Sequence, residues 1–152
     1  MASNGQFECS LSEVQRLLAI GTPVNTKSIP GAPPGYTLLH FATHHGNLRC
    51  VRALHEQGAR LDEKSKHGQT AVHFAVAAGR EKLICVLHEL GASITSKDED
   101  GFTPLHCAAF KGFSKCICVL IDLGAKLTDI DLLGLTPLHN AAYNGNIECV
   151  RV

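Results

Sequence analysis

A twelve-residue motif that recurs four times constrains this chain more than any other feature. It reads GYTLLHFATHHG from Gly35, GQTAVHFAVAAG from Gly68, GFTPLHCAAFKG from Gly101 and GLTPLHNAAYNG from Gly134, so the copies begin every 33 residues. A fixed period of about 20 to 50 residues is typical of solenoids, in which each copy is one supersecondary unit. The chain is therefore expected to fold as a stack of similar layers.

Each copy carries the signals that start and stop a short helix. In the third copy Gly101 predicts a turn, Thr103 is a good N-cap and Pro104 suits the first helical position. The helix is expected to cover roughly residues 104–110 and to end at Gly112, because glycine readily adopts the left-handed conformation that closes a helix.

A second helix is expected over about residues 114–122, followed by an extended stretch over 125–128. The apolar positions recur in register with this assignment. They are Leu39, Val72, Leu105 and Leu138 in the first helices, Val51, Ile84, Ile117 and Val150 in the second, and Ala42, Ala75, Ala108 and Ala141 where paired helices approach closely. Helices this short are marginal in isolation. Their stability must come from stacking each copy on the next.

This pattern resembles the ankyrin repeat, which has a period of about 33 residues and the signature Thr-Pro-Leu-His-x-Ala. Residues 103–108 and 136–141 match the signature, whereas Leu38 and Ala71 replace the proline in the first two copies. The resemblance implies an all-α fold, a solenoid of stacked helix-turn-helix units with β-hairpin-like loops. It divides the chain into a degenerate N-terminal capping repeat (1–31), three repeats (32–64, 65–97 and 98–130) and an incomplete repeat (131–152).

The two ends depart from the regular pattern. Residues 11–25 are expected to form the second helix and the following strand of the degenerate first repeat. The proline-rich segment 29–34 is expected to lengthen the hairpin loop that comes next. An array normally ends in a polar cap. Val150 and Val152 would lack cover after an unfinished repeat, so we expect the natural chain to continue beyond them.

Composition excludes several classes of function. Lys plus Arg and Asp plus Glu both number 14, so the net charge is zero, which disfavours binding to nucleic acid or to an anionic membrane by charge. No apolar run is long enough to span a bilayer. Seven cysteines without a recognisable secretory leader favour a reducing compartment, the cytoplasm or the nucleus. We expect a monomer.

Nine histidines raise the possibility of a metal site, but the spacing argues against one. The motif histidines lie one per repeat, and zinc requires its donor atoms about 2.0–2.3 Å from one centre. The resemblance implies instead that these histidines bond to the capping threonines and neighbouring backbone. The residues expected to be structural are Thr37, His40, Thr70, His73, Thr103, His106, Thr136 and His139, with Gly46, Gly79, Gly112 and Gly145.

No catalytic constellation or phosphate-binding motif is present in the sequence, so no enzyme activity, cofactor or metal is expected. Cys116 and Cys118 should point to different faces of their helix. Cys50, Cys116 and Cys149 occupy one equivalent position, which Leu83 fills in the remaining copy. That position is expected to be inward, with cysteine used as a small apolar residue.

Binding specificity is expected at positions that vary between copies, at the loop tips and the ends of the first helices. The candidate partner-binding residues are Tyr36, His44, His45, Lys66, His67, Glu99, Asp100, Phe102, Phe110, Lys111, Leu132, Leu133, Leu135 and Tyr143. Six of these form what we call the apolar strip: Phe102, Phe110, Leu132, Leu133, Leu135 and Tyr143. Exposed apolar groups of this kind mark interaction sites. The alternative is that the leucines pack on a following repeat or an adjacent loop.

Three functions are compatible with these observations. The first is a non-catalytic scaffold or adaptor that binds a protein or peptide on the concave face and loop tips. The second is the recognition arm of a larger enzyme or ubiquitin-ligase complex whose catalytic part lies outside this segment. The third is a spacer in a channel or cytoskeletal linker. A fold of this kind supports all three, so the site must decide between them.

Overall fold

The computed structural model describes residues 11–27, 29 and 32–151. These residues form nine α-helices and no β-strand, which confirms the all-α repeat fold. The helices are α1 (Leu11–Ala19), α2 (Leu38–His44), α3 (Leu48–Glu56), α4 (Ala71–Ala77), α5 (Glu81–Glu89), α6 (Pro104–Lys111), α7 (Ser114–Asp122), α8 (Pro137–Tyr143) and α9 (Ile147–Arg151).

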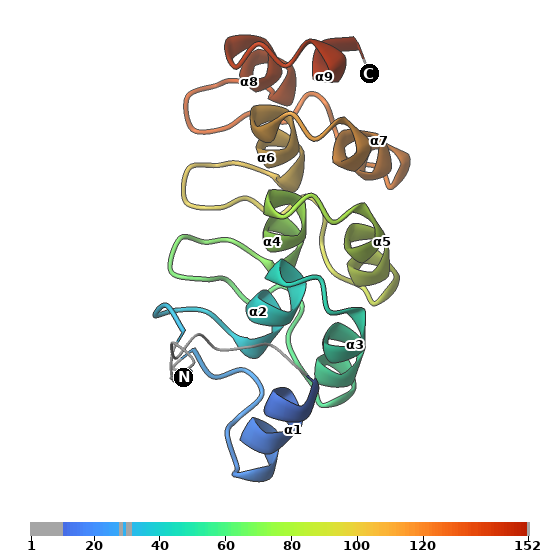
Figure 1. The fold of residues 1–152 in the computed structure, drawn as a ribbon. Coiled ribbons are helices and arrows are strands. Elements are labelled where there is room, and N and C mark those ends of the chain that lie inside the picture. Colours follow the sequence, from blue (N-terminus) through green and yellow to red (C-terminus); the bar gives the residue numbers. More distant parts are fainter. Residues whose placement is uncertain (1–10, 28, 30–31, 152) are drawn as a thin grey trace, which may run out of the picture.

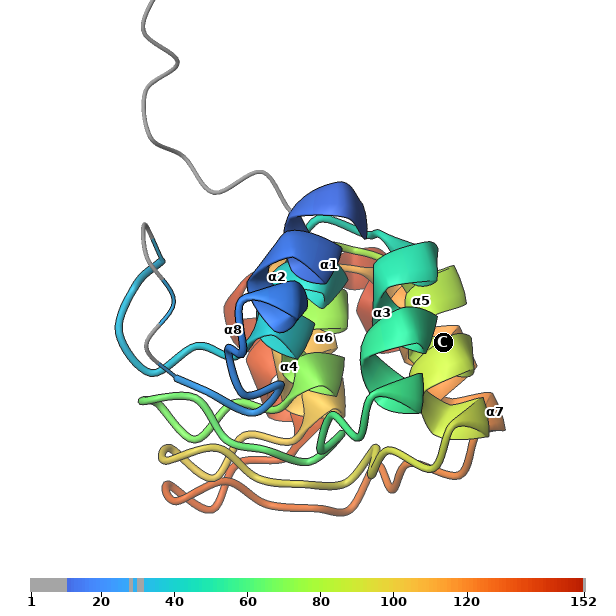
Figure 2. The ribbon, with the colours of Figure 1, turned by 90° about the horizontal axis from the view of Figure 1, so that it is seen from below.

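The helices stack in two columns (Figure 1). The first helices of the layers, α2, α4, α6 and α8, form one column, and the second helices, α3, α5, α7 and α9, form the other. The loops that join one layer to the next project together from the first-helix side of the stack, as the view along the stack also shows (Figure 2). Helix α1 contacts α3 at the N-terminal end of the stack, where the degenerate repeat was expected. The proline-rich segment after it lies partly outside the described residues.

The third layer shows how local sequence sets these helices. Thr103 caps α6, Pro104 begins it, and Gly112 ends it in the left-handed conformation with φ +78°. These bounds agree closely with the range expected from the sequence. The equivalent alanines of all four layers are buried, which lets the first and second helices pack closely. A single apolar core therefore runs along the stack from Val14 to Cys149.

The inter-layer loops are hairpin-like without forming strands. In the third layer the Asp98 backbone N–H donates to the Phe102 carbonyl oxygen at 3.0 Å, which closes the loop tip. The extended stretch predicted over residues 125–128 is wrong in its second half. Residues 127–128 form a turn, because the Asp129 N–H bonds back to the Lys126 carbonyl at 3.4 Å instead of pairing with a neighbouring segment.

The last described layer differs from the others in its exposure. Leu138 is 51% exposed, whereas Leu105 one layer earlier is 1% exposed. Val150 likewise is exposed, whereas its equivalents Val51, Ile84 and Ile117 are buried. Among the described residues no layer covers α8 and α9, so the same apolar positions face solvent there.

A glycine at each loop tip permits close approach of the next loop, and this leads to a prediction. A Cβ on Gly101 would lie 2.8 Å from the Leu132 backbone nitrogen, whereas a Cβ on Gly134 would meet nothing within 4 Å. Both glycines have positive φ, +79° and +75°. Replacing either with alanine therefore strains the backbone by about 1 kcal/mol, and Gly101→Ala adds a further steric cost of about 1–3 kcal/mol.

Urea unfolding of Gly101→Ala and Gly134→Ala tests this difference directly. The two variants share the conformational penalty, so the difference between their free energies of unfolding isolates the inter-layer contact. Equal losses of stability would show that the loops separate without cost.

Candidate functional site

The Thr-x-x-His motif forms a hydrogen-bonded unit that joins two layers. The Thr103 backbone N–H donates to His106 Nδ1 at 3.2 Å, and the Thr103 hydroxyl oxygen lies 2.8 Å from the same nitrogen. His106 Nε2 lies 3.1 Å from the Leu135 carbonyl oxygen in the next loop. Because Nδ1 accepts the backbone N–H, the ring proton is on Nε2 and donates to that carbonyl. The imidazole thus ties the cap of one helix to the following layer.

The other copies vary this unit in informative ways. His73 Nε2 lies 2.9 Å from the Phe102 carbonyl oxygen, the position equivalent to that of Leu135. His40 Nε2 instead lies 2.9 Å from the carbonyl of Glu63, nearer the start of its loop. His139 contacts Thr136 in the same way, but no described layer follows to receive its Nε2. The motif histidines therefore serve as scaffold, with the inter-layer bond present in three copies.

Burial keeps the imidazoles of His40, His73 and His106 neutral. It lowers the pKa of His40 to about 4, with a further lowering from the charge of Lys27. Burial is also the main cause that lowers the pKa of His73 and of His106. Protonation would place a charge among apolar groups and convert Nδ1 from acceptor to donor, which breaks the bond to the threonine N–H.

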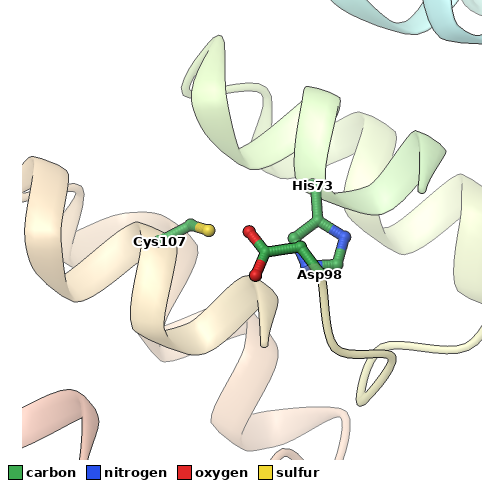
Figure 3. A group of neighbouring side chains, drawn as sticks. All are labelled: His73, Asp98 and Cys107. Carbon is green, nitrogen blue, oxygen red and sulfur yellow. The ribbon is translucent and has the colours of Figure 1, made fainter. Parts of the chain in front are cut away.

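Sequence reasoning did not group His73 with Asp98 and Cys107, yet the structure brings them together (Figure 3). Their potential ligand atoms lie within 4.8 Å of one another. The spacing of the repeats could have indicated this proximity, because Asp98 and Cys107 belong to the layer that stacks on the layer of His73.

The hydrogen bonds of these three residues do not fit a metal site. The Thr70 N–H occupies the lone pair of His73 Nδ1 at 3.1 Å, and His73 Nε2 donates to the Phe102 carbonyl. Asp98 Oδ1 accepts a backbone N–H from Phe102 at 2.9 Å. Burial raises the pKa of the Cys107 thiol to about 12, so the sulfur is neutral. A metal ion would have to break the helix cap, and we assign the cluster to the scaffold.

Three lysines link successive loops through hydrogen bonds that were not predicted from the sequence, and we call them the lysine ladder. Lys27 Nζ donates to the Lys64 carbonyl at 2.7 Å, Lys64 Nζ to the Lys97 carbonyl at 2.8 Å, and Lys97 Nζ to the Ile130 carbonyl at 2.7 Å. The recurrence of lysine at 64 and 97, one period apart, was the available signal. Lys64 therefore belongs to the scaffold, although it lies near a variable loop tip.

The cysteines lie as their positions on the helices predict. Cys116 and Cys149 are buried at the position that Leu83 fills in another layer, whereas Cys118 is exposed. Burial raises the pKa of the Cys116 thiol to about 11. These buried thiols are packing groups and lack the thiolate character that nucleophilic or metal-binding cysteines need.

The candidate partner-binding residues separate into exposed and half-buried sets. The exposed ones are His44, His45, Lys66, His67, Glu99, Asp100, Phe110, Lys111, Leu132, Leu133 and Tyr143, and the half-buried ones are Tyr36, Phe102 and Leu135. The carbonyls of Phe102 and Leu135 accept the inter-layer histidine bonds. These two residues therefore contribute to the scaffold as well as to the variable surface.

The structure brings some of these residues together and keeps others apart. The Phe102 ring stacks on His106 at 5.6 Å between centroids and lies 6.4 Å from the Phe110 ring. His67 Nδ1 lies 3.2 Å from a Glu99 carboxylate oxygen, so the second and third loop tips pair. Tyr36 contacts Phe74 at 5.0 Å at the opposite end of the array. The aromatic candidates therefore form separate clusters around Tyr36 and around Phe102, with the His67–Glu99 pair between them.

Comparison with known proteins settles the family. A family model described as ankyrin repeats in three copies matches residues 1–98 and 91–152. The chain belongs to the ankyrin-repeat family. No curated protein matches it closely enough to be counted a relative.

Ankyrin repeats are generally protein–protein interaction modules and are typically non-catalytic. This assignment agrees with the site, where the motif histidines and threonines of the ankyrin layers are engaged in hydrogen bonds that hold the array. Among the described residues no helix is both long and apolar enough to cross a bilayer.

Proposed function

We propose that this ankyrin array is a non-catalytic scaffold or adaptor that binds a protein or peptide partner with its loop tips and first helices. The proposal rests on the division of labour among the side chains. Residues that recur from layer to layer hold the stack, whereas most of the variable candidate residues are exposed. We further propose that the chain acts as a monomer in the cytoplasm or nucleus and does not bind nucleic acid, in keeping with its zero net charge.

The observation that carries this proposal is the exposure of the apolar strip. Leu132, Leu133 and Tyr143 are 74%, 81% and 89% exposed, and Phe110 is about half exposed. Asp131 holds the loop tip in this display, because its Oδ1 accepts the Leu133 backbone N–H at 2.8 Å. Because the loop tip is already ordered before binding, its two leucines can be buried by a partner at a low cost in conformational entropy. Large apolar side chains grouped in this way favour a partner that buries them.

An affinity capture experiment from cell lysate tests the strip. The bait is the chain with Phe110→Ala, Leu133→Glu and Tyr143→Ala together, compared with wild type by mass spectrometry. We expect proteins that bind wild type to be lost from this variant. A matched control is Ile20→Glu, since Ile20 is 70% exposed but lies at the other end of the array.

Circular dichroism establishes that each bait is folded. All three substitutions of the strip variant are at exposed positions, so its stability should change little. Recovery of the same proteins by wild type and the strip variant would remove the strip as the binding surface. Loss of the same proteins from the Ile20→Glu bait would indicate non-specific adsorption to exposed apolar residues and not a defined binding site.

A further inference from the structure

A cavity of about 230 Å³ lies at the N-terminal end of the array, away from the apolar strip. It is lined by Pro33, Tyr36, His40, Phe41, His44 and Phe74. These residues come from α2, from α4 and from the loop that precedes α2. The volume is below the range of about 300–1,000 Å³ that is typical of sites for whole drug-sized ligands. It suits a single side chain.

The walls of this cavity are aromatic and held in place. The Tyr36 ring meets the Phe74 ring edge to face at 5.0 Å and the Phe41 ring at 5.8 Å. The His40 ring lies 4.8 Å from Phe74, and both of its nitrogens bond to the scaffold. His40 therefore presents carbon atoms to the cavity and no spare polar group. An apolar side chain that enters the cavity therefore breaks no hydrogen bond of the His40 ring.

The aromatic pair that lines the cavity occurs at one junction between the described full layers. The position of Tyr36 is held by Gln69, Phe102 and Leu135 in the later copies, and that of Phe74 by Cys107 and Asn140. Only the first and second full repeats combine a large ring at both positions. The later layers stack without a ring at both positions. Stacking of the layers therefore does not by itself require the pair Tyr36 and Phe74.

Two cationic residues lie close to wall residues of the cavity. A Cβ on Gly46 would lie 2.9 Å from the Arg80 guanidinium, so Arg80 lies at the end of α2 beside the exposed His44. On the other side, a Cβ on Gly35 would lie 2.8 Å from the Lys66 Cβ. No carboxylate in the described part of the chain forms an ion pair with Arg80 or Lys66. The nearby Glu63 is already paired with Lys27 at 2.7 Å.

We infer that this cavity binds one apolar side chain of a peptide segment in which acidic residues flank that side chain and face Arg80 and Lys66. Aromatic walls also suit an alkylated ammonium group. The two cations close to the wall residues disfavour that guest, because like charges repel at close range. The inference extends the proposed function, on which it rests for the class of partner, to a second site with its own specificity.

Selection from a phage-displayed library of random dodecapeptides tests this site on the whole chain. We expect wild type to enrich peptides with one large apolar residue next to Asp or Glu. A synthetic, fluorescein-labelled copy of the enriched peptide then gives dissociation constants by anisotropy. Tyr36→Gln, which copies the residue at the equivalent position of the second repeat, is expected to weaken binding at least tenfold. Ile147→Gln, a change at an exposed residue of α9 at the other end of the array, is expected to weaken it less than twofold.

Two further variants separate the cavity from the nearby cations. His44→Glu alters an exposed wall residue and keeps the test valid if Tyr36→Gln fails to fold. Lys66→Gln with Arg80→Gln is expected to weaken binding at least fivefold and to abolish its sensitivity to salt. A set of enriched peptides with basic flanks, or affinity unchanged by Tyr36→Gln and His44→Glu, would overturn the inference.

The remaining outcomes also decide between the two sites. Peptides that still bind Tyr36→Gln but are lost from the apolar-strip variant would refute the cavity and support the strip. If no peptide is enriched, the inference about the cavity is refuted. The proposed function is then still tested separately, by the capture experiment with the apolar-strip variant.

Discussion

Lowering the pH from 7 to 5 is expected to destabilise the array strongly, through the buried histidines of the layer junctions. Burial lowers the pKa of His40, His73 and His106 in the folded chain. The unfolded chain therefore binds more protons than the folded chain as the pH falls below about 6.5, and stability is lost. For His40 alone, a pKa of about 4 against an ordinary value of 6.5 corresponds to roughly 2 kcal/mol lost by pH 5. His73 and His106 add to this loss in the same direction.

Urea unfolding at several pH values between 7.5 and 5 measures the effect. Remaining above pH 5 limits the contribution from protonation of carboxylates such as Glu63. His40→Gln is expected to be less stable at pH 7 but to show a shallower fall with pH, because its group does not titrate. His139→Gln is the matched control, since it makes the same substitution at an exposed motif histidine without a described inter-layer bond. Identical slopes for wild type and His40→Gln would show that His40 does not couple protonation to unfolding.

Shortening one leucine is expected to have a large effect in the third layer and a small one in the fourth. Leu105 and Leu138 occupy the same position of the repeat, but Leu105 is fully enclosed and Leu138 is half exposed. Leu105→Ala removes buried apolar area and leaves a cavity, which costs about 2–5 kcal/mol. Leu138→Ala is expected to cost less than about 1 kcal/mol, as exposed substitutions usually do.

Chemical denaturation of the two variants provides the measurement, with wild type in the same buffer. Because the substitution and the helix position are identical, differences in helix propensity cancel. A loss for Leu138→Ala as large as that for Leu105→Ala would mean that α8 is covered in solution, by another copy or by further chain.

Much of the fold was predictable because it depends on local chemistry. Thr103 and Pro104 start a helix, and Gly112 ends it, through interactions with residues only a few positions away. The 33-residue period extended that prediction to every layer. The scaffold role of the histidines followed from the family resemblance.

The details of the loops were less predictable. The turn at residues 127–128 was mistaken for extended chain, since short polar segments carry weak periodic signals. Leu135 was counted as an exposed anchor, but its carbonyl accepts the His106 bond and its side chain is half buried. The turn is closed by the local bond from the Asp129 N–H to the Lys126 carbonyl, whereas a contact between layers decides the position of Leu135.

The sequence by itself determined that the chain is a stack of ankyrin layers, because each layer's helices are specified by nearby caps and by apolar residues in a fixed register. Only the tertiary structure decided which of the equivalent positions are buried, as Leu105 and Leu138 illustrate. It alone brought Tyr36, Phe41 and Phe74 around one cavity, and it placed Arg80 beside Gly46 and Lys66 beside Gly35. The reason is physical: burial, cavities and the pairing of charges depend on distances across layers, which the chain acquires only when the repeats stack.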